Sequence, residues 1–219
     1  MNKPLQVDYY SDMLCVWAWI AVPRLQELQK QWGNQIHICH HYVDVFGDLE
    51  KKIEKSWASK NGYSGFADHV QQSVANFEEI HVHPELWLSV RPTTSANSHL
   101  VVKAVKLVHG QGMAEKIDFA IRRAFFLDNR DISNMDCLFD LLQQNSLSPE
   151  EIQSLLQDGT AIAALMSDYR KARSESIKGS PTYVLDGGRQ MLFGNVGYRV
   201  IHANIEELLR KPKGEASWC

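Results

Sequence analysis

Hydrophobic and polar positions follow successive patterns along the chain. Residues 5–10 and 36–45 are rich in β-branched and aromatic side chains and alternate roughly between apolar and polar, which predicts two strands. Between them, apolar side chains recur every three to four positions from Leu14 to Gly33, which predicts a helix kinked at Pro23. This order predicts a strand–helix–strand unit with a parallel pair of strands.

The middle of the chain has helical periodicity, and its end returns to strands. Helices are predicted over 66–80, 95–109, 114–127, 135–144, 149–156, 160–174 and 198–210. Strands are predicted at 182–185 and 190–193, on either side of an Asp-Gly-Gly turn. Because neither strand-rich end can bury a sheet alone, we predict one α/β sheet domain from residues 1–46 and 178–219, with a helical insertion over 47–177. Residues 211–219 are expected to be frayed.

Composition and charge narrow the class of protein. The 219 residues are 44% hydrophobic and 22% charged, which is typical of a globular chain. A net charge of -3 gives no basic field for a phosphate backbone, so we expect no nucleic-acid partner. No apolar run approaches the roughly 18 residues of a membrane span, and no signal-peptide pattern precedes Leu5. We therefore expect a cytoplasmic protein without a membrane partner, in which the four separated cysteines form no structural disulfide.

Cys15 is the first candidate for chemistry, because it lies where the first strand meets the first helix. Functional sites gather at this edge of a sheet. A helix N-terminus favours the thiolate and lowers the pKa of a thiol, and the thiolate is the nucleophile. The alternative is that Cys15 is a small buried side chain among tryptophans, and this segment alone does not decide between the two.

Two further segments are candidates for binding. The Ser180-Pro181 bond directly before a strand is either an ordinary loop or a cis-proline, and the sequence does not show which. Gly194 and Asn195 precede the last helix, whose free backbone N–H groups could hold a carboxylate, although a plain turn would look the same.

Together these segments resemble the DsbA-like thioredoxin superfamily. The resemblance is carried by an Asp-x-x-Cys turn at 12–15, a long helical insertion, and Gly-x-Pro-Thr-aromatic at 179–183 before a hairpin and a last helix. The chain is most similar to the cytoplasmic branch that includes FrnE-type oxidoreductases, 2-hydroxychromene-2-carboxylate isomerase and kappa-class glutathione transferases. This implies a thioredoxin fold (β-α-β … β-β-α) with a large all-helical insertion.

The resemblance also implies roles for individual residues. Cys15 takes the position of the attacking cysteine, and Pro181 that of the cis-proline facing it. The residues that it places around a bound peptide or glutathione are Trp17, Ala18, Ser180, Thr182, Gly194 and Asn195. No tightly bound cofactor is implied, and glutathione is a candidate co-substrate. Relatives of this family are often dimers, and by this analogy a homodimer is one candidate for the oligomeric state.

The departure from the family is Ala18, which stands where the oxidoreductases carry their second cysteine. A dithiol enzyme resolves its mixed disulfide with that second thiol. Either glutathione resolves the intermediate, or one of the three other cysteines, Cys39, Cys137 or Cys219, arrives from elsewhere in the fold. The third option is that Cys15 replaces the serine that positions the glutathione sulfur in the isomerases and transferases.

Three functions follow, in order of preference. The first is a single-cysteine thiol–disulfide oxidoreductase that is coupled to glutathione and acts on small thiols or disulfides, or on protein thiols. The second is a glutathione-dependent isomerase or transferase that acts on a small aromatic electrophile. The third is a non-catalytic thioredoxin-fold binding protein.

Other groups of residues favour structural interpretations. His37, Cys39 and His41 share one face of a predicted strand, but i,i+2 neighbours lie about 7 Å apart, so we expect no metal site. The Arg122-Arg123 pair is interpreted as a solvated helix face. Four aromatic residues are expected in the core of the insertion, some of them beside a substrate pocket between insertion and sheet: Trp57, Phe66, Trp87 and Phe126.

Overall fold

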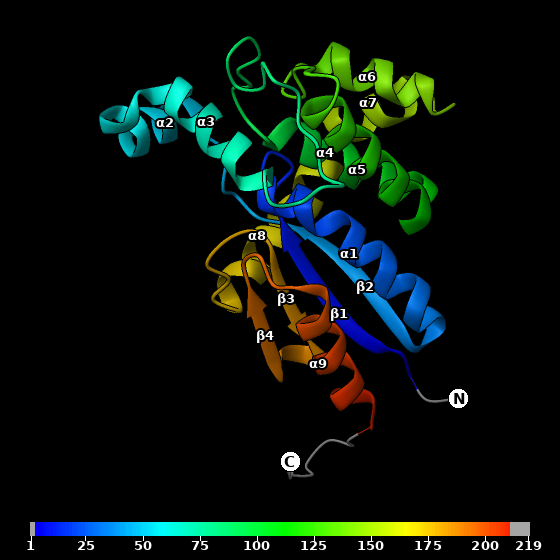
Figure 1. Ribbon diagram of the computed structural model, residues 1–219. Helices are drawn as coiled ribbons and strands as arrows, with labels where there is room; N and C mark the ends of the chain where they lie inside the picture. Colours follow the sequence, from blue (N-terminus) through cyan, green and yellow to red (C-terminus); the bar gives the residue numbers. More distant parts are fainter. Residues whose placement is uncertain (1–2, 211–219) are drawn as a thin grey trace.

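The computed structural model describes residues 3–210 and places a four-stranded sheet below a block of helices (Figure 1). The strands are β1 (Leu5–Ser11), β2 (Ile36–Tyr42), β3 (Thr182–Leu185) and β4 (Gln190–Phe193). The α-helices are α1 (Val16–Trp32), α2 (Leu49–Trp57), α3 (Gly62–Val74), α4 (Ala96–His109), α5 (Gln111–Phe126), α6 (Met135–Gln144), α7 (Pro149–Gln157), α8 (Thr160–Ser174) and α9 (Tyr198–Arg210). The predicted fraying of 211–219, and Cys219, lie outside the described residues.

The sheet joins the two ends of the chain in the order β2-β1-β3-β4. β1 pairs in parallel with β2, with Leu5 opposite Ile36, and antiparallel with β3, with Tyr9 opposite Tyr183. β4 completes the sheet as an antiparallel edge strand beside β3. This arrangement confirms the predicted thioredoxin fold with a helical insertion.

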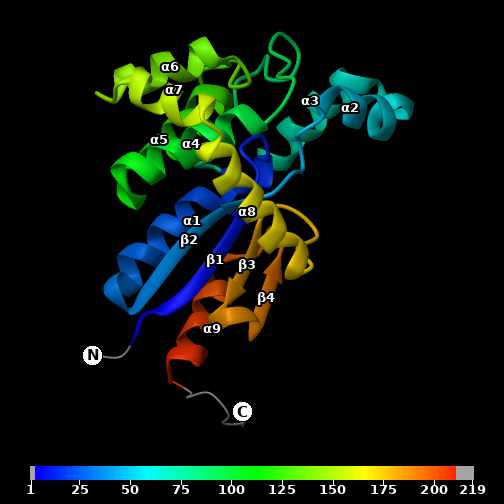
Figure 2. The same cartoon turned by 180° about the vertical axis from the view of Figure 1, so that it is seen from behind.

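Helices cover both faces of the sheet because its strands carry buried side chains on both sides. On one face, Val7 and Tyr9 pack with Leu25 of α1 and with Ile201 and Ile205 of α9. On the other face, a cluster forms under the end of α8: Tyr10, Val43, Ala172 and Val184. Figure 2 shows α8 descending from the helical block across this second face. α8 therefore lies within the insertion in sequence, but its end packs against the sheet.

The helical block was predicted well except at its beginning. α2 was missed, although Asp48 caps it by accepting from the Lys51 N–H at 3.2 Å, and Leu49 and Ile53 are buried one turn apart. α3 begins and ends earlier than predicted, because the chain turns at residues 75–80. Within residues 3–210, no helix combines the length and the apolar character that a membrane crossing requires.

The predicted aromatic core of the insertion is present. Phe66, Trp87 and Phe126 are buried and Trp57 is half-buried in the largest apolar cluster, which also includes the first turn of α1. Trp87 packs edge-on against Phe125, with ring centroids 5.0 Å apart. The four predicted aromatic residues thus lie within the core.

Candidate functional site

Cys15 is the N-cap residue of α1, four residues after the end of β1. Its carbonyl oxygen accepts from the Ala18 and Trp19 N–H groups, each at 3.0 Å. Its thiol donates to the carbonyl oxygen of Ser180 at 3.3 Å. The residue is only 5% exposed. Cys15 therefore lies at the predicted edge of the sheet, but its sulfur is enclosed.

Because the sulfur is enclosed, the pKa of the Cys15 thiol shifts in the direction opposite to the prediction. From its position at a helix N-terminus we expected a lowered pKa. In the structure, burial raises the pKa of Cys15. The hydrogen bonds that favour the thiolate, from the Ser180 side chain and from the backbone N–H groups of Ala18 and Trp17, do not compensate. The expectation of a lowered pKa was wrong.

The Ser180-Pro181 segment meets the opening turn as the resemblance implied. The peptide bond between the two residues is cis. The Ser180 hydroxyl accepts from the Asp12 N–H at 2.9 Å, next to the contact between its carbonyl and Cys15. The Pro181 carbonyl accepts from the Gly194 N–H at 2.8 Å. Three segments far apart in sequence therefore converge at one place.

The other predicted site residues have structural partners. Trp17 is half-buried and packs against the helical core, whereas Ala18 is fully buried. The buried Thr182 donates its hydroxyl hydrogen to the Gly179 carbonyl at 2.8 Å. Ala18 is therefore a core residue, and the Thr182 side chain stabilises the segment that contains the cis-proline.

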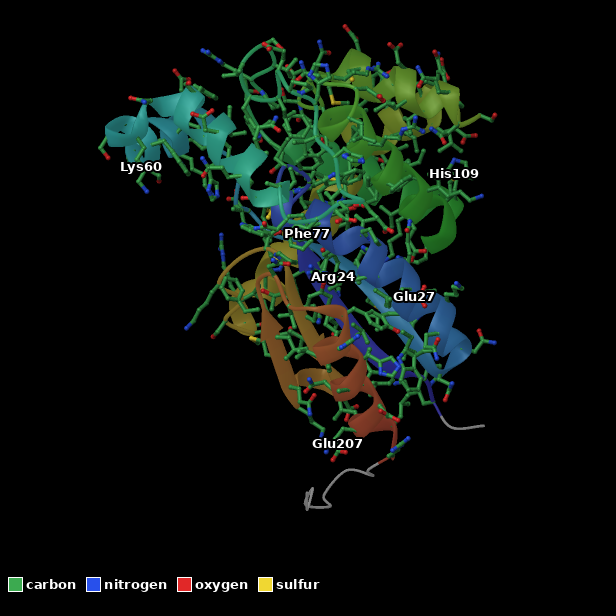
Figure 3. All side chains as sticks on the ribbon, in the orientation of Figure 1. Arg24, Glu27, Lys60, Phe77, His109 and Glu207 are labelled. Carbon is green, nitrogen blue, oxygen red and sulfur yellow. The ribbon has the colours of Figure 1, made fainter. Side chains whose placement is uncertain are left out.

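Asn195 is exposed, and an arginine that the sequence analysis did not consider engages its side chain. Arg24 of α1 donates from Nη1 to the Asn195 side-chain oxygen at 2.6 Å and to the Val196 carbonyl at 2.9 Å. The same guanidinium lies 5.6 Å from the centre of the Phe77 ring, and Figure 3 labels both side chains. Arg24 therefore fixes the Gly194-Asn195 loop to α1 and to the segment after α3.

Asp12 is the main residue whose role the sequence analysis missed. Its carboxylate is fully buried and accepts four hydrogen bonds from three parts of the chain. The donors are the Leu14 N–H at 3.0 Å, the Val45 N–H at 3.1 Å, the Phe46 N–H at 3.0 Å and the Ser95 hydroxyl at 2.9 Å. Asp12 therefore joins the Cys15 turn, the loop after β2 and the start of α4.

Arg122 is buried, which corrects the prediction of a solvated face. Its side chain is 2% exposed and donates to Asp118 at 2.8 Å, to the Asp12 carbonyl at 3.0 Å and to the Ser11 hydroxyl at 2.9 Å. Burial works against the charge of Asp118, but the neighbouring Arg122 guanidinium outweighs it and lowers the Asp118 pKa. The pair connects α5 with the end of β1.

His41 lies in a second buried polar network, under α8, rather than at a metal site. Its ring nitrogens lie 2.8 Å from Asp8 and 3.1 Å from Asp168, and Lys103 lies 2.8 Å from Asp168. Burial works to lower the His41 pKa, but the two carboxylates outweigh it and raise the pKa. Within the described part of the chain, no three His, Cys, Asp or Glu side chains come together in a metal-binding group.

The remaining described cysteines lie away from Cys15. Cys39 on β2 lies opposite Asp8 of β1, and Asp8 is three residues, or about 10 Å, before the end of β1. Cys137 lies on α6. Both are half-buried free thiols. None of the three described cysteines forms a disulfide.

A thioredoxin-like sheet with a helical insertion, and a thiol beside a cis-proline, define a DsbA-type thioredoxin-fold protein. A family model agrees, since the DSBA-like thioredoxin domain matches residues 6–206. The chain belongs to this family.

Two curated relatives are adapter proteins. The ClpXP adapter protein SpxH of Halalkalibacterium halodurans is 25% identical over 221 residues, which cover 95% of this chain and 69% of the relative. SpxH of Bacillus subtilis is 20% identical over 183 residues, which cover 83% of this chain and 58% of the relative. The matched region is therefore a part of longer proteins.

Two of the solved structures with the same fold are named as enzymes. The cytosolic disulfide reductase DsbM from Pseudomonas aeruginosa with GSH superposes with a TM-score of 0.72 at 18% identity, over 94% of this chain and 100% of that chain. 2-Hydroxychromene-2-carboxylate isomerase superposes with a TM-score of 0.67 at 15% identity, over 94% of this chain and 96% of that chain. At these identities the likeness concerns the fold.

Proposed function

We propose that this chain is a thioredoxin-fold binding protein of the adapter type, in which the former redox centre is structural. The observation that carries this proposal is the buried Cys15 thiol, which is bonded to the Ser180 carbonyl and has a raised pKa. A thiol whose pKa is raised by burial carries less of the nucleophilic thiolate at neutral pH than a free cysteine does. With Ala18 in place of a second cysteine, the centre lacks both an accessible nucleophile and a neighbouring resolving thiol.

A binding surface adjoins this centre at the edge of the sheet. β4 is an edge strand, and its Met191 and Phe193 are 46% and 58% exposed. The residue after Phe193, Gly194, is bonded to Pro181. Open backbone groups on an edge strand, next to exposed apolar side chains, suit an extended segment of a partner protein. The two SpxH relatives support a partner of this kind, since both are ClpXP adapters.

The test measures binding to purified ClpX of Bacillus subtilis by biolayer interferometry. We expect binding by the wild type, equal binding by Cys15→Ser, and loss of binding by Phe193→Asp. Ile162→Asp on α8, where the native side chain is 52% exposed, is the matched control and should bind normally. Loss of binding by Cys15→Ser but not by Phe193→Asp would contradict the proposal.

The second candidate is the glutathione-coupled oxidoreductase, and the Cys15 sulfur beside cis-Pro181 favours it. DsbM, a disulfide reductase with the same fold, is consistent with this alternative. Intact-mass analysis after incubation with oxidised glutathione separates the two functions. One rapid adduct that maps to Cys15 in the folded protein would favour the enzyme, and the absence of an adduct favours the binding protein.

The remaining expectations form part of these proposals. Glutathione as co-substrate, small thiols or disulfides as substrates, and isomerase or transferase chemistry belong to the enzymatic alternatives. A cytoplasmic location agrees with the cytosolic DsbM. The absence of a nucleic-acid partner, and the homodimer, stay predictions from the sequence.

A further inference from the structure

A large cavity lies between α1, α5 and the sheet, and Cys15, Ser180 and Pro181 are not among its lining residues. Its volume is about 620 Å³. Small-molecule sites commonly enclose about 300–1,000 Å³ and combine apolar walls with a few polar groups. The size of the cavity therefore suits an organic ligand.

The cavity is elongated along α1. On this helix its lining extends from Ala18 to Lys30, about 18 Å at a rise of about 1.5 Å per residue. Trp19 stacks on Phe119 of α5 with ring centroids 6.1 Å apart, so the first half of α1 lies beside the second half of α5. Lys116, which precedes Phe119 on α5, therefore lies toward Lys30. We call the Ala18 end the inner end and the Lys30 end the outer end.

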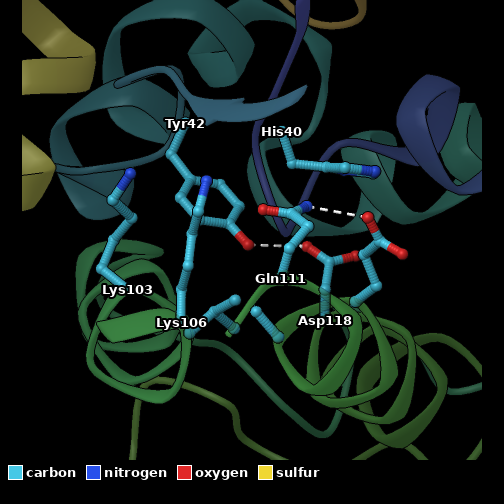
Figure 4. A pocket seen from close by; sticks show the side chains of 9 residues that line it. His40, Tyr42, Lys103, Lys106, Gln111 and Asp118 are labelled. Carbon is cyan, nitrogen blue, oxygen red and sulfur yellow. Dashed lines mark hydrogen bonds between the residues drawn. The ribbon is translucent and has the colours of Figure 1, made fainter. Parts of the chain in front are cut away.

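The inner end contains two polar groups that lack partners. The Tyr9 hydroxyl and His40 Nδ1 are buried and have no hydrogen-bond partner among residues 3–210. Burial raises the pKa of Tyr9 and lowers that of His40, and both shifts favour the neutral form of the side chain. The neighbouring Asp118 is already paired with Arg122 and accepts from Tyr42 at 2.9 Å, in the adjoining hollow that Figure 4 shows. A neutral oxygen atom of a ligand would satisfy the unpartnered groups.

The other parts of the cavity differ in character. Apolar side chains line the middle: Val22, Leu25, Ile38 and Phe119. At the outer end, Lys30 of α1 and Lys116 of α5 bring positive charge from both walls, and Glu115 brings one negative charge. The only ion pair of Lys30 within the described residues is with Glu27 at 3.8 Å, on an exposed surface where such pairs are weak. The outer end therefore favours an anion.

We infer that this cavity binds an elongated apolar carboxylate that carries a neutral oxygen group at the end opposite its charge. The carboxylate lies between the two lysines, the apolar chain lies along α1, and the neutral oxygen accepts from the Tyr9 hydroxyl. Neither Met191 and Phe193 of the proposed partner surface nor Cys15, Ser180 and Pro181 line this site.

Isothermal titration calorimetry with three probes of equal length tests each part of this inference. We expect 10-hydroxydecanoate to bind about fivefold more tightly than decanoate, the effect of one net hydrogen bond. We expect it to bind more tightly than the uncharged 1,10-decanediol as well. Undetectable binding of 10-hydroxydecanoate at millimolar concentration, or equal binding of all three probes, would overturn the inference.

Variants assign the binding to this cavity. Tyr9→Phe should remove the preference for 10-hydroxydecanoate over decanoate, and its fold should be retained because the deleted hydroxyl has no partner. Val22→Trp fills the middle of the cavity and should reduce affinity at least tenfold, whereas Val200→Trp on the exposed face of α9 should not.

Charge reversal and solution size complete the test. The double variant Lys30→Glu, Lys116→Glu should weaken 10-hydroxydecanoate more than 1,10-decanediol. Cys15→Ser and Phe193→Asp should bind the probes normally, so a failure here is distinguishable from a failure of the proposed function. The wild type could instead sediment as a dimer that the Val22→Trp substitution dissociates, and bind none of the probes. That result would show that the cavity is an interface between two copies of the chain and would overturn the ligand site.

Discussion

Replacing Asp12 by alanine should destabilise the protein severely. The substitution removes the acceptor of four hydrogen bonds, from the Leu14, Val45 and Phe46 N–H groups and the Ser95 hydroxyl. The carboxylate is 0% exposed, so water reaches these donors only if the structure opens. Each buried donor left unsatisfied costs about 1–3 kcal/mol, and entering water recovers a part of this.

We therefore expect Asp12→Ala to lower the free energy of unfolding by about 3–5 kcal/mol, as for removal of one partner from a buried charged network. Since a domain has about 5–15 kcal/mol in total, this is a large fraction of its stability. Ser95→Ala removes one of the four donors and should cost about 1 kcal/mol. Asp12→Asn keeps one acceptor oxygen and should lie between the two.

Urea unfolding followed by tryptophan fluorescence measures these differences, with equal slopes required for comparison. Asp140→Ala is the control, because its side chain is 62% exposed, and it should change stability by less than about 0.5 kcal/mol. A loss below about 1 kcal/mol for Asp12→Ala would refute the reasoning. If Asp12→Ala does not fold, the order of Asp12→Asn and Ser95→Ala still decides.

Three other predictions concern groups near this network. At pH 7, iodoacetamide should label Cys15 at least about 100-fold more slowly than the half-buried Cys137, because Cys15 reacts only after the structure opens locally. Mass spectrometry of peptides measures the labelling rate of each cysteine. The flanking carboxylates overcome the effect of burial and raise the pKa of His41 in the folded protein. Protonated His41 therefore stabilises the fold fully below about pH 6.5, the pKa of the unfolded chain, and this contribution is lost as the pH rises through the pKa of the folded protein. The stability difference between wild type and His41→Gln, from urea unfolding, should therefore shrink from pH 6 to 9. Arg122→Met should cost about 3–5 kcal/mol in the same assay, because it leaves Asp118 buried without its partner, and Arg122→Lys should restore only part of this.

Local patterns were sufficient to predict the strands and most helices. The β-branched and aromatic run of β1 and the helical spacing of apolar residues in α4 are both visible in a short window, although β1 is buried on both of its faces. The hairpin of β3 and β4 was predicted from its Asp-Gly-Gly turn. α2 was missed because its apolar face is a short row of three residues, Leu49, Ile53 and Trp57, and lysines fill much of the rest.

Buried charge was not predictable in the same way. Arg122 has the spacing of a solvated side chain. Asp118 lies one turn earlier on the same helix, but only the tertiary structure brings Asp12 and Ser11 to the guanidinium. Asp12 was considered only as the first residue of the Asp-x-x-Cys turn for the same reason. Both residues bind backbone or side-chain groups that lie far away in sequence, and a single chain without its fold contains no signal for such pairing.

The direction of the Cys15 pKa shows why position alone did not decide its chemistry. A helix N-terminus stabilises a nearby negative charge by about 0.3–1 kcal/mol, and by up to about 2 kcal/mol in partly buried geometries. Removing an ion from water costs several kcal/mol, so in a residue that is only 5% exposed burial outweighs the dipole and raises the pKa of the thiol. The helix start makes a thiol reactive only where water or a cationic partner reaches it. In this chain the thiol donates its hydrogen to the Ser180 carbonyl, and burial raises the pKa of the cysteine at the position that corresponds to the attacking cysteine of the family.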